Sequence, residues 1–375
     1  MSHETDESLD SERSFETALL DTSGIDYSEA SSVDSKRHSI EGFREIQGLD
    51  GFYNAAVWTE NGKTYLWGRQ VETAGKEGQP DIGSLVLKTL GPHGEVASSK
   101  ELWKPGDSEY LLEDPRALQL PDGRIAFGLT AVDHVDDDYI PYPAVLITST
   151  KELMGGDFPE PIVIRTLGSG DQTMPLGKDV SYIAGKNVTS LGPNLFAFRQ
   201  EDDNHRLKVF EYRGAGEDIA YSQDILLPKN IPWAQFKIGT TTSPIWLNEH
   251  EAVLLIHGIR RTENNKLEYS IGSSRLLKDE KGILSIDNIS PEPLIYPDLF
   301  NGPFDTRETE LHEERRVVYL CGALAVRGVN DDLEYIKAYP NVGDKRTVEV
   351  ILPVVNITKG WKRHNPTEPE ISRVA

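Results

Sequence analysis

The sequence contains very little cysteine and no long apolar stretch. Cys321 is the one cysteine among 375 residues, so the chain cannot form an internal disulfide, which favours a reducing compartment. No apolar run approaches the roughly 20 residues of a membrane-spanning helix. The opening residues, MSHETDESLD, lack the basic and apolar regions of a secretory signal. We therefore expect a cytoplasmic protein without a membrane segment.

Basic residues are also scarce. Lys and Arg number 39 against 61 Asp and Glu, which gives a net charge of −22. Such a chain repels nucleic acid and anionic lipid, so neither is expected as a partner. A site for an anionic ligand would need a local cluster of basic side chains.

Several catalytic signatures are missing as well. The nine histidines form no H-x-x-x-H pair and no Cys/His ligand set, so we expect no metal. The chain has no Walker A loop, no G-x-S-x-G turn and no G-x-G-x-x-G between a strand and a helix. No resident cofactor is therefore expected.

Residues 1–38 differ in composition from the remainder of the chain. They contain ten acidic residues against three basic ones, Arg13, Lys36 and Arg37, and few clustered apolar residues. Such a segment cannot bury enough surface to offset the entropy lost on ordering. We predict an acidic disordered arm over residues 1–38 and a single folded domain over 39–375.

From about Ile40 onward, short runs rich in β-branched and aromatic residues recur, and no stretch keeps helical periodicity. These runs span 65–69, 124–130, 144–148, 195–199, 207–212, 252–259, 316–326 and 347–355. Turn sequences separate them, such as Pro-Asp-Gly at 121–123. The pattern predicts an all-β fold, and hairpins over most of the chain fit a β-propeller better than a sandwich.

One motif combines a carboxylate with a proline and an arginine. Residues 111–116 read Leu-Leu-Glu-Asp-Pro-Arg. Pro115 disfavours a helical conformation at Asp114 and pushes it towards an extended one, which would display its carboxylate at the entrance of the strand 124–130. Arg116 would favour the ionised form if the two side chains meet. A surface ion pair in a loop is the alternative interpretation.

Four further cationic or imidazole side chains occur in otherwise apolar segments. They are Arg69, Arg199, Lys237 and His257. Each alone could reach water from the end of a strand. A propeller, however, brings one end of every blade towards a common axis, so the four would meet there. Together, Lys, Arg and His suit phosphate or carboxylate oxygens.

The order of these motifs resembles glycoside hydrolase family 130. The resemblance covers residues 52–355 and rests on Asn54-Ala-Ala with Leu-Trp-Gly-Arg69, Glu113-Asp-Pro-Arg116, Lys186-Asn with Phe-Ala-Phe-Arg199, Lys237-Ile-Gly with Leu-Ile-His257-Gly, and Tyr269-Ser-Ile-Gly. The family comprises β-mannoside phosphorylases and related mannosidases on a five-bladed β-propeller. The resemblance therefore implies that fold and an oligosaccharide substrate.

The resemblance also implies roles for individual residues. Asp114 resembles the general acid, which protonates the departing glycosidic oxygen. The residues implied to contact the sugar are Asn54, Arg69, Arg116 and Asp344. The residues implied to hold phosphate are Lys186, Arg199, Lys237, His257 and Tyr269. The phosphorylases carry an arginine where this chain offers Lys186 or, earlier, Lys178-Asp179, and a lysine keeps the charge but loses the bidentate fork.

The expected activity is cleavage of a β-mannoside or related glycoside with inversion, by transfer to inorganic phosphate and release of a sugar 1-phosphate. A phosphorylase needs only the acid, because phosphate is already an ionised nucleophile, whereas an inverting hydrolase needs a second carboxylate about 6.5–9.5 Å away. The alternatives are a phosphate-independent β-mannosidase and a non-catalytic sugar-binding propeller. An arabinosidase-like enzyme with a carboxylate triad ranks below them.

Overall fold

The computed structural model describes residues 42–73, 82–135, 138–156, 158–165, 176–183, 194–200, 206–214, 219–228, 231–300, 315–343, 346–358 and 361. The arm predicted over residues 1–38 and the predicted site residues Lys186 and Asp344 lie outside these ranges. The regular secondary structure of the described residues is almost entirely strand, with a few short helices, so the all-β prediction is confirmed.

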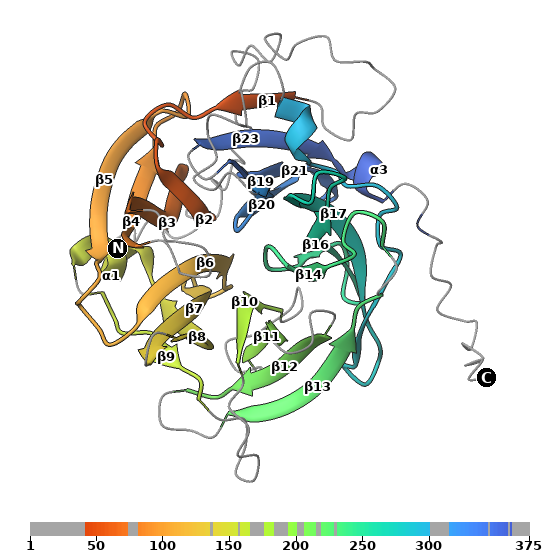
Figure 1. Cartoon of the computed structure of the whole chain (residues 1–375), viewed down its shortest axis with the longest axis horizontal. Coiled ribbons are helices and arrows are strands. Elements are labelled where there is room, and N and C mark those ends of the chain that lie inside the picture. Colours follow the sequence, from red (N-terminus) through yellow and green to blue (C-terminus); the bar gives the residue numbers. More distant parts are fainter. Residues whose placement is uncertain are drawn as a thin grey trace, which may run out of the picture.

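Three antiparallel sheets of four strands each stand around a central axis in a propeller-like arrangement (Figure 1). The first contains β2 (Phe52–Glu60), β3 (Lys63–Thr73), β4 (Ile82–Leu90) and β5 (Val96–Trp103). The second contains β6 (Leu111–Gln119), β7 (Ile125–Val135), β8 (Asp138–Thr148) and β9 (Ile162–Val163). The third contains β10 (Gly177–Tyr182), β11 (Asn194–Gln200), β12 (Arg206–Tyr212) and β13 (Ala220–Leu226).

An eleven-stranded sheet makes up the rest of the ring. Its strands are β1 (Gly42–Glu45), β14 (Lys237–Thr240), β15 (Ile245–Trp246), β16 (Glu251–Arg261), β17 (Leu267–Lys278), β18 (Leu284–Asp287), β19 (Arg315–Tyr319), β20 (Ala323–Arg327), β21 (Leu333–Ala338), β22 (Asn341–Val342) and β23 (Arg346–Pro353). Within the described residues, its two halves join where β17 pairs in parallel with β19. β1, the first described strand, pairs with β23, near the end of the described chain.

The predicted strand runs fall on strands of the structure, with two corrections. The run 316–326 is two strands, β19 and β20, because these pair with different neighbours: β19 with β17 and β22, β20 with β21. The run 347–355 ends at Pro353, where α3 (Val354–Ile357) begins. The other described helices, α1 (Thr150–Gly155) and η3 (Pro297–Phe300), are short, and no helix of the described chain could span a membrane.

Apolar side chains fill the space between neighbouring sheets. Between the first two sheets, the rings of Trp67 and Phe127 pack edge to face, with centroids 4.6 Å apart. Further clusters follow around the ring, and the last joins Tyr339 after β21 to Val57 and Leu66 of the first sheet. This packing leaves β2, β6 and β10 nearest the axis (Figure 1).

Candidate active site

Three neighbouring inner strands carry the same irregularity. β2, β6 and β10 are each interrupted near their start by a β-bulge. The residues in these bulges, Asn54, Asp114 and Asp179, have left-handed backbones with φ of 53°, 52° and 63°. This conformation is uncommon for residues other than glycine, and Asn and Asp adopt it most readily. Because bulges re-aim side chains and occur often beside active sites, these three positions mark a candidate site.

The structure corrects the expected backbone at Asp114. This residue was predicted to be extended and to stand at the entrance of the strand 124–130. It lies instead within β6, in the left-handed region. Pro115 has no N–H to donate to the sheet. Asp114 and Pro115 therefore form the bulge, and regular pairing resumes at Arg116, which lies opposite Gly128.

Asp114 lies in contact with two of the predicted sugar-binding residues. Asn54 Nδ2 donates a 2.7 Å hydrogen bond to Asp114 Oδ1, and Arg69 Nη1 is 3.7 Å from the same oxygen. The backbone N–H of Asn54 is held in turn by Asn341 Oδ1 at 2.8 Å. The Asp114 side chain remains 14% exposed, so a ligand at the axis can reach it.

The surroundings of Asp114 favour its protonated form. Burial raises the pKa of Asp114 above its ordinary value, and the neighbouring charge of Glu113 raises it further. Arg69, Arg116 and the hydrogen bond from Asn54 oppose this shift without cancelling it. Glu113 is itself buried between two cations, with Arg69 Nη2 at 3.3 Å and Lys178 Nζ at 3.7 Å.

Asp179 is the centre of a second, fully buried network. Arg116 Nη2 donates to its Oδ1 at 2.8 Å, and Arg199 Nε donates to its Oδ2 at 2.8 Å. The hydroxyl of Tyr319 donates to Oδ1 at 2.7 Å, and His257 Nε2 lies 3.6 Å from Oδ2. Burial alone would raise the pKa of Asp179, but the charges around it outweigh burial and hold the pKa well below its usual range.

His257 is neutral at pH 7. Burial is the main reason that the pKa of His257 is lowered to about 4; the charge of Asp179 opposes this shift, and the cations Arg199, Arg116 and Lys237 add to it. Its Nδ1 has no hydrogen-bond partner among the described residues. The glycine of the Lys237-Ile-Gly motif is explained here, because a Cβ at Gly239 would lie 2.4 Å from Asp179 Oδ2.

The remaining predicted residues lie near this network in different ways. Arg116 Nη1 donates a 3.1 Å hydrogen bond to the backbone carbonyl oxygen of Asp114. The sequence had suggested a contact with the Asp114 carboxylate instead. Lys237 starts β14 and is close enough to affect the pKa of His257. Tyr269 lies half-buried beside a small cluster that includes Tyr319.

Two residues at the centre of the site carried no predicted role. From the sequence, Asp179 was noted only as part of Lys178-Asp179, a segment that differs from the family pattern. No feature of the sequence indicated a role for Tyr319. The spacing of Asn54, Asp114 and Asp179, which are 60 and 65 residues apart, is a weak internal repeat that could have identified Asp179.

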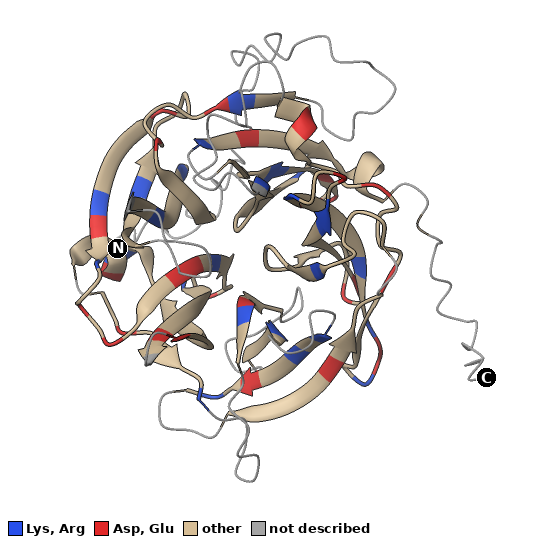
Figure 2. Cartoon of the chain, viewed as in Figure 1, with Lys and Arg blue, Asp and Glu red and all other residues tan. Residues whose placement is uncertain are grey.

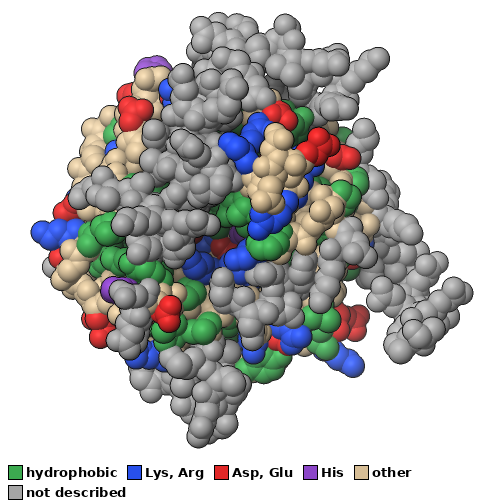
Figure 3. Space-filling view, in the orientation of Figure 1, with side chains coloured by type: hydrophobic (Ala, Val, Ile, Leu, Met, Phe, Trp, Pro, Cys, Tyr) green, Lys and Arg blue, Asp and Glu red, His purple; other side chains and the backbone are tan. Residues whose placement is uncertain are grey.

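The described site has more positive than negative charge. Even with Asp114 counted as ionised and His257 as neutral, five cations face three carboxylates. The cations are Arg69, Arg116, Lys178, Arg199 and Lys237, and the carboxylates are Glu113, Asp114 and Asp179. Figure 2 shows charged positions near the axis on β6 and β10, and Figure 3 shows basic side chains gathered at the centre of this face. No group of three metal-ligating side chains occurs within the described ranges.

Comparison with known proteins identifies relatives by structure alone. No family model matches the chain, and no curated protein matches it either. A glycosyl hydrolase from Bacteroides ovatus superposes with a TM-score of 0.59 at 13% identity, over 84% of this chain and 97% of the other. A second structure superposes with a TM-score of 0.57 at 13% identity, over 83% of this chain and 94% of the other. Its description reads that the GH130 family of mannoside phosphorylases contains glycoside hydrolases that target β-1,2 mannosidic linkages in Candida mannan. The chain therefore has the fold of these enzymes, and the resemblance that its motifs indicated is confirmed at the level of the fold.

Proposed function

We propose that this protein cleaves β-mannosides with inversion and transfers the mannosyl group to inorganic phosphate, with Asp114 as the general acid. One observation carries the proposal: a carboxyl group with a raised pKa stands at the axis, partly exposed, in contact with Asn54 and Arg69. A general acid must hold its proton at the working pH, and burial beside Glu113 provides that condition.

The same contacts suit the state that follows proton transfer. Once Asp114 has given its proton to the departing glycosidic oxygen, directly or through a sugar hydroxyl, it is a carboxylate. Asn54 already donates to Oδ1, and Arg69 lies beside the same oxygen. Donors that are in place before the reaction stabilise the developing charge without further reorganisation.

The properties of the Asp179 carboxylate favour phosphorolysis over hydrolysis. An inverting hydrolase needs a carboxylate that removes a proton from water. Asp179 is a weak base, because its pKa is depressed and both of its oxygens already accept hydrogen bonds. The surplus of positive charge, in a chain whose net charge is −22, instead suits a phosphate dianion that is already ionised.

We also propose a five-bladed propeller formed by one domain. The three four-stranded sheets would be three blades, and β14 to β18 would form a fourth. The fifth would run β20, β21, β23 and β1, so that the first described strand closes the ring. The single cysteine, Cys321, is buried and unpaired, which fits the cytoplasm as the proposed compartment.

The decisive experiment incubates the protein with β-manno-oligosaccharides of defined linkage, with and without phosphate, and follows products by NMR. We expect α-mannose 1-phosphate that forms only when phosphate is present. Free mannose at equal rates in both conditions would identify a β-mannosidase and overturn phosphorolysis. Binding without any product would identify a non-catalytic sugar-binding protein.

A further inference from the structure

A cavity of about 410 Å³ lies at the other end of the inner strands from Asp114. On β6, Asp114 stands near the start, whereas the end of the strand, Ala117 to Gln119, lines this cavity. Three to five residues of strand separate Asp114 from these positions, which corresponds to roughly 10–15 Å. On β2, Asn54 and Thr59 are divided in the same way. The cavity is therefore separate from the candidate active site.

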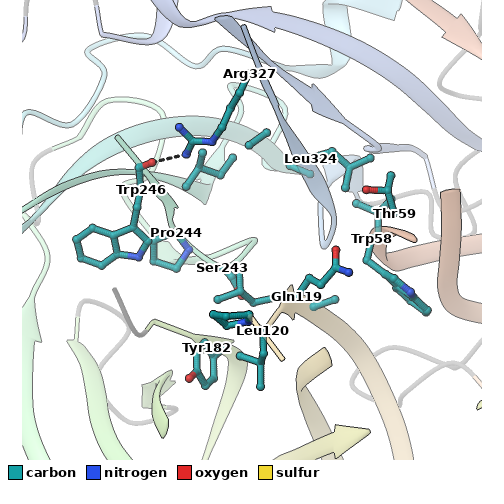
Figure 4. Close-up of a pocket in the computed structure, with 17 residues that line it drawn as sticks. Trp58, Thr59, Gln119, Leu120, Tyr182, Ser243, Pro244, Trp246, Leu324 and Arg327 are labelled. Carbon is teal, nitrogen blue, oxygen red and sulfur yellow. Dashed lines mark hydrogen bonds between the residues drawn. The ribbon is translucent and has the colours of Figure 1, made fainter. Parts of the chain in front are cut away.

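Unpartnered polar groups from two separate segments line the cavity (Figure 4). Ser243 Oγ and Trp246 Nε1, both on residues 5% exposed, have no hydrogen-bond partner within the part of the chain that the structure describes. Gln119 is exposed, and its amide makes no hydrogen bond to any described residue. Buried polar groups are almost always satisfied, so the two buried donors, Ser243 Oγ and Trp246 Nε1, point to a ligand or to ordered water.

The charges around the cavity argue against an ionic ligand. Arg327 is the one charged residue among the described residues that line it. Its Nη1 donates to the backbone oxygen of Asp331, and its Nη2 donates to the backbone oxygen of Trp246. Its Nε lies 3.6 Å from the Asp331 carboxylate. The guanidinium is thus committed to the protein and offers little to a phosphate or carboxylate.

The remaining lining combines apolar walls with neutral hydrogen-bonding groups. Leu118, Leu120, Pro244 and Leu324 provide the walls. The indole N–H is a donor only, whereas the Ser hydroxyl and the Gln amide both donate and accept. A pyranose has matching chemistry, with hydroxyl groups for the polar atoms and C–H faces for the walls.

We propose that this cavity is a second saccharide-binding site, which takes a neutral mono- or disaccharide and plays no part in bond cleavage. Its volume falls within the range of roughly 300–1,000 Å³ typical of small-molecule pockets. The proposal does not depend on the chemistry of Asp114, because none of its residues belongs to that network.

The test follows the indole N–H signals of protein labelled with 15N-tryptophan, in the Asp114→Asn background to prevent turnover. The Trp246 signal is assigned with Trp246→Phe. We expect this signal to move saturably on addition of β-1,2-mannobiose, and not with mannose 1-phosphate. Ser243→Ala and Gln119→Leu should each weaken the affinity about threefold to tenfold, the effect of one lost hydrogen bond. Ser98→Ala, at an exposed position on β5, is the matched control and should change nothing.

Three outcomes would overturn the site. The Trp246 signal could stay fixed with mannobiose and with cellobiose. Alternatively, it could move equally in Asp114→Asn alone and with Ser243→Ala or Gln119→Leu added, but not with Asn54→Ala added, which would show a signal relayed from the active site. A response to mannose 1-phosphate alone would reveal an anion site in its place. Failure of the proposed activity would leave these signals readable, so the two proposals fail separately.

Discussion

Asp114 and Asp179 share a local structure and have opposite electrostatics. Each lies in a bulge near the start of an inner strand, with a left-handed backbone. The pKa of Asp114 is raised, chiefly by burial. Burial also acts on Asp179, but the protonated form of His257, two guanidinium groups and a phenol outweigh it and hold the pKa of Asp179 low. Equivalent positions in neighbouring sheets therefore serve different purposes, and the partners of each carboxylate decide which.

The difference lies in the number and distance of the cations. Asp179 receives guanidinium donors from Arg116 and Arg199, both at 2.8 Å. Asp114 has Arg69 at 3.7 Å and the carboxylate of Glu113 as its neighbour in the chain. One carboxylate is a fixed anion that orders the cations around it, and the other is free to exchange a proton.

The largest expected effect is on catalysis at Asp114. Asp114→Asn keeps the shape and the contact with Asn54 but removes the acid, so the release of mannose 1-phosphate should slow by about 10² to 10⁴. The melting temperature should be unchanged or raised, because a buried titratable group is lost. Initial rates and thermal unfolding measure the two effects. Full activity in this variant would remove Asp114 from the acid role.

Asp179→Asn should affect stability first. The change leaves Arg116 and Arg199 buried without their counter-charge, which should lower the free energy of unfolding by about 3–5 kcal/mol. Denaturant titration measures it. The control is Asp122→Asn, which breaks the exposed pair with Arg124 and should cost about 1 kcal/mol or less. Equal losses in both variants would contradict the central role of Asp179.

The pH dependence of stability, compared between wild type and His257→Gln, tests whether the Asp179 network includes a neutral imidazole. Its folded pKa of about 4 lies below the unfolded value of 6.5. As pH falls from 6.5 to 4, the unfolded state gains a proton that the folded state does not, so stability should fall by up to roughly 3 kcal/mol. His257→Gln should remove this part of the pH dependence in denaturant titrations. An unchanged slope between pH 6.5 and 4 would mean that folding does not lower the pKa of His257.

The smallest effect concerns the tuning of Asp114. Activity should fall as pH rises through the raised pKa of Asp114, because only the protonated form donates. Glu113→Gln removes a charge that helps to raise this pKa, so the alkaline limb of kcat/KM should move to lower pH, on the order of one pH unit or less. Glu109→Gln, with a side chain 70% exposed, is the control. A limb that stays in place would exclude Glu113 from tuning the acid.

Much of the fold could be predicted because its signals are local. Alternating apolar runs and turn residues predict the strands. The run 316–326 shows what such patterns miss, because β19 and β20 are separated by their different pairing partners and not by composition. Motif order also indicated that Arg69, Arg116, Arg199 and His257 belong near Asp114, and the structure brings these residues together in one region. Their functions, and those of Lys186 and Asp344, stay predictions.

The sequence by itself determined the strands and the scarcity of basic residues, because each follows from neighbouring residues or from composition, and the order of its motifs indicated the candidate acid by resemblance to a family. Only the tertiary structure decided which carboxylate has a raised pKa. That choice depends on groups far apart in the chain: Arg116 is 63 residues from Asp179, and Tyr319 is 140 residues from it. A pKa reflects burial and charge within a few ångströms, and those distances exist only once the sheets have packed around the axis.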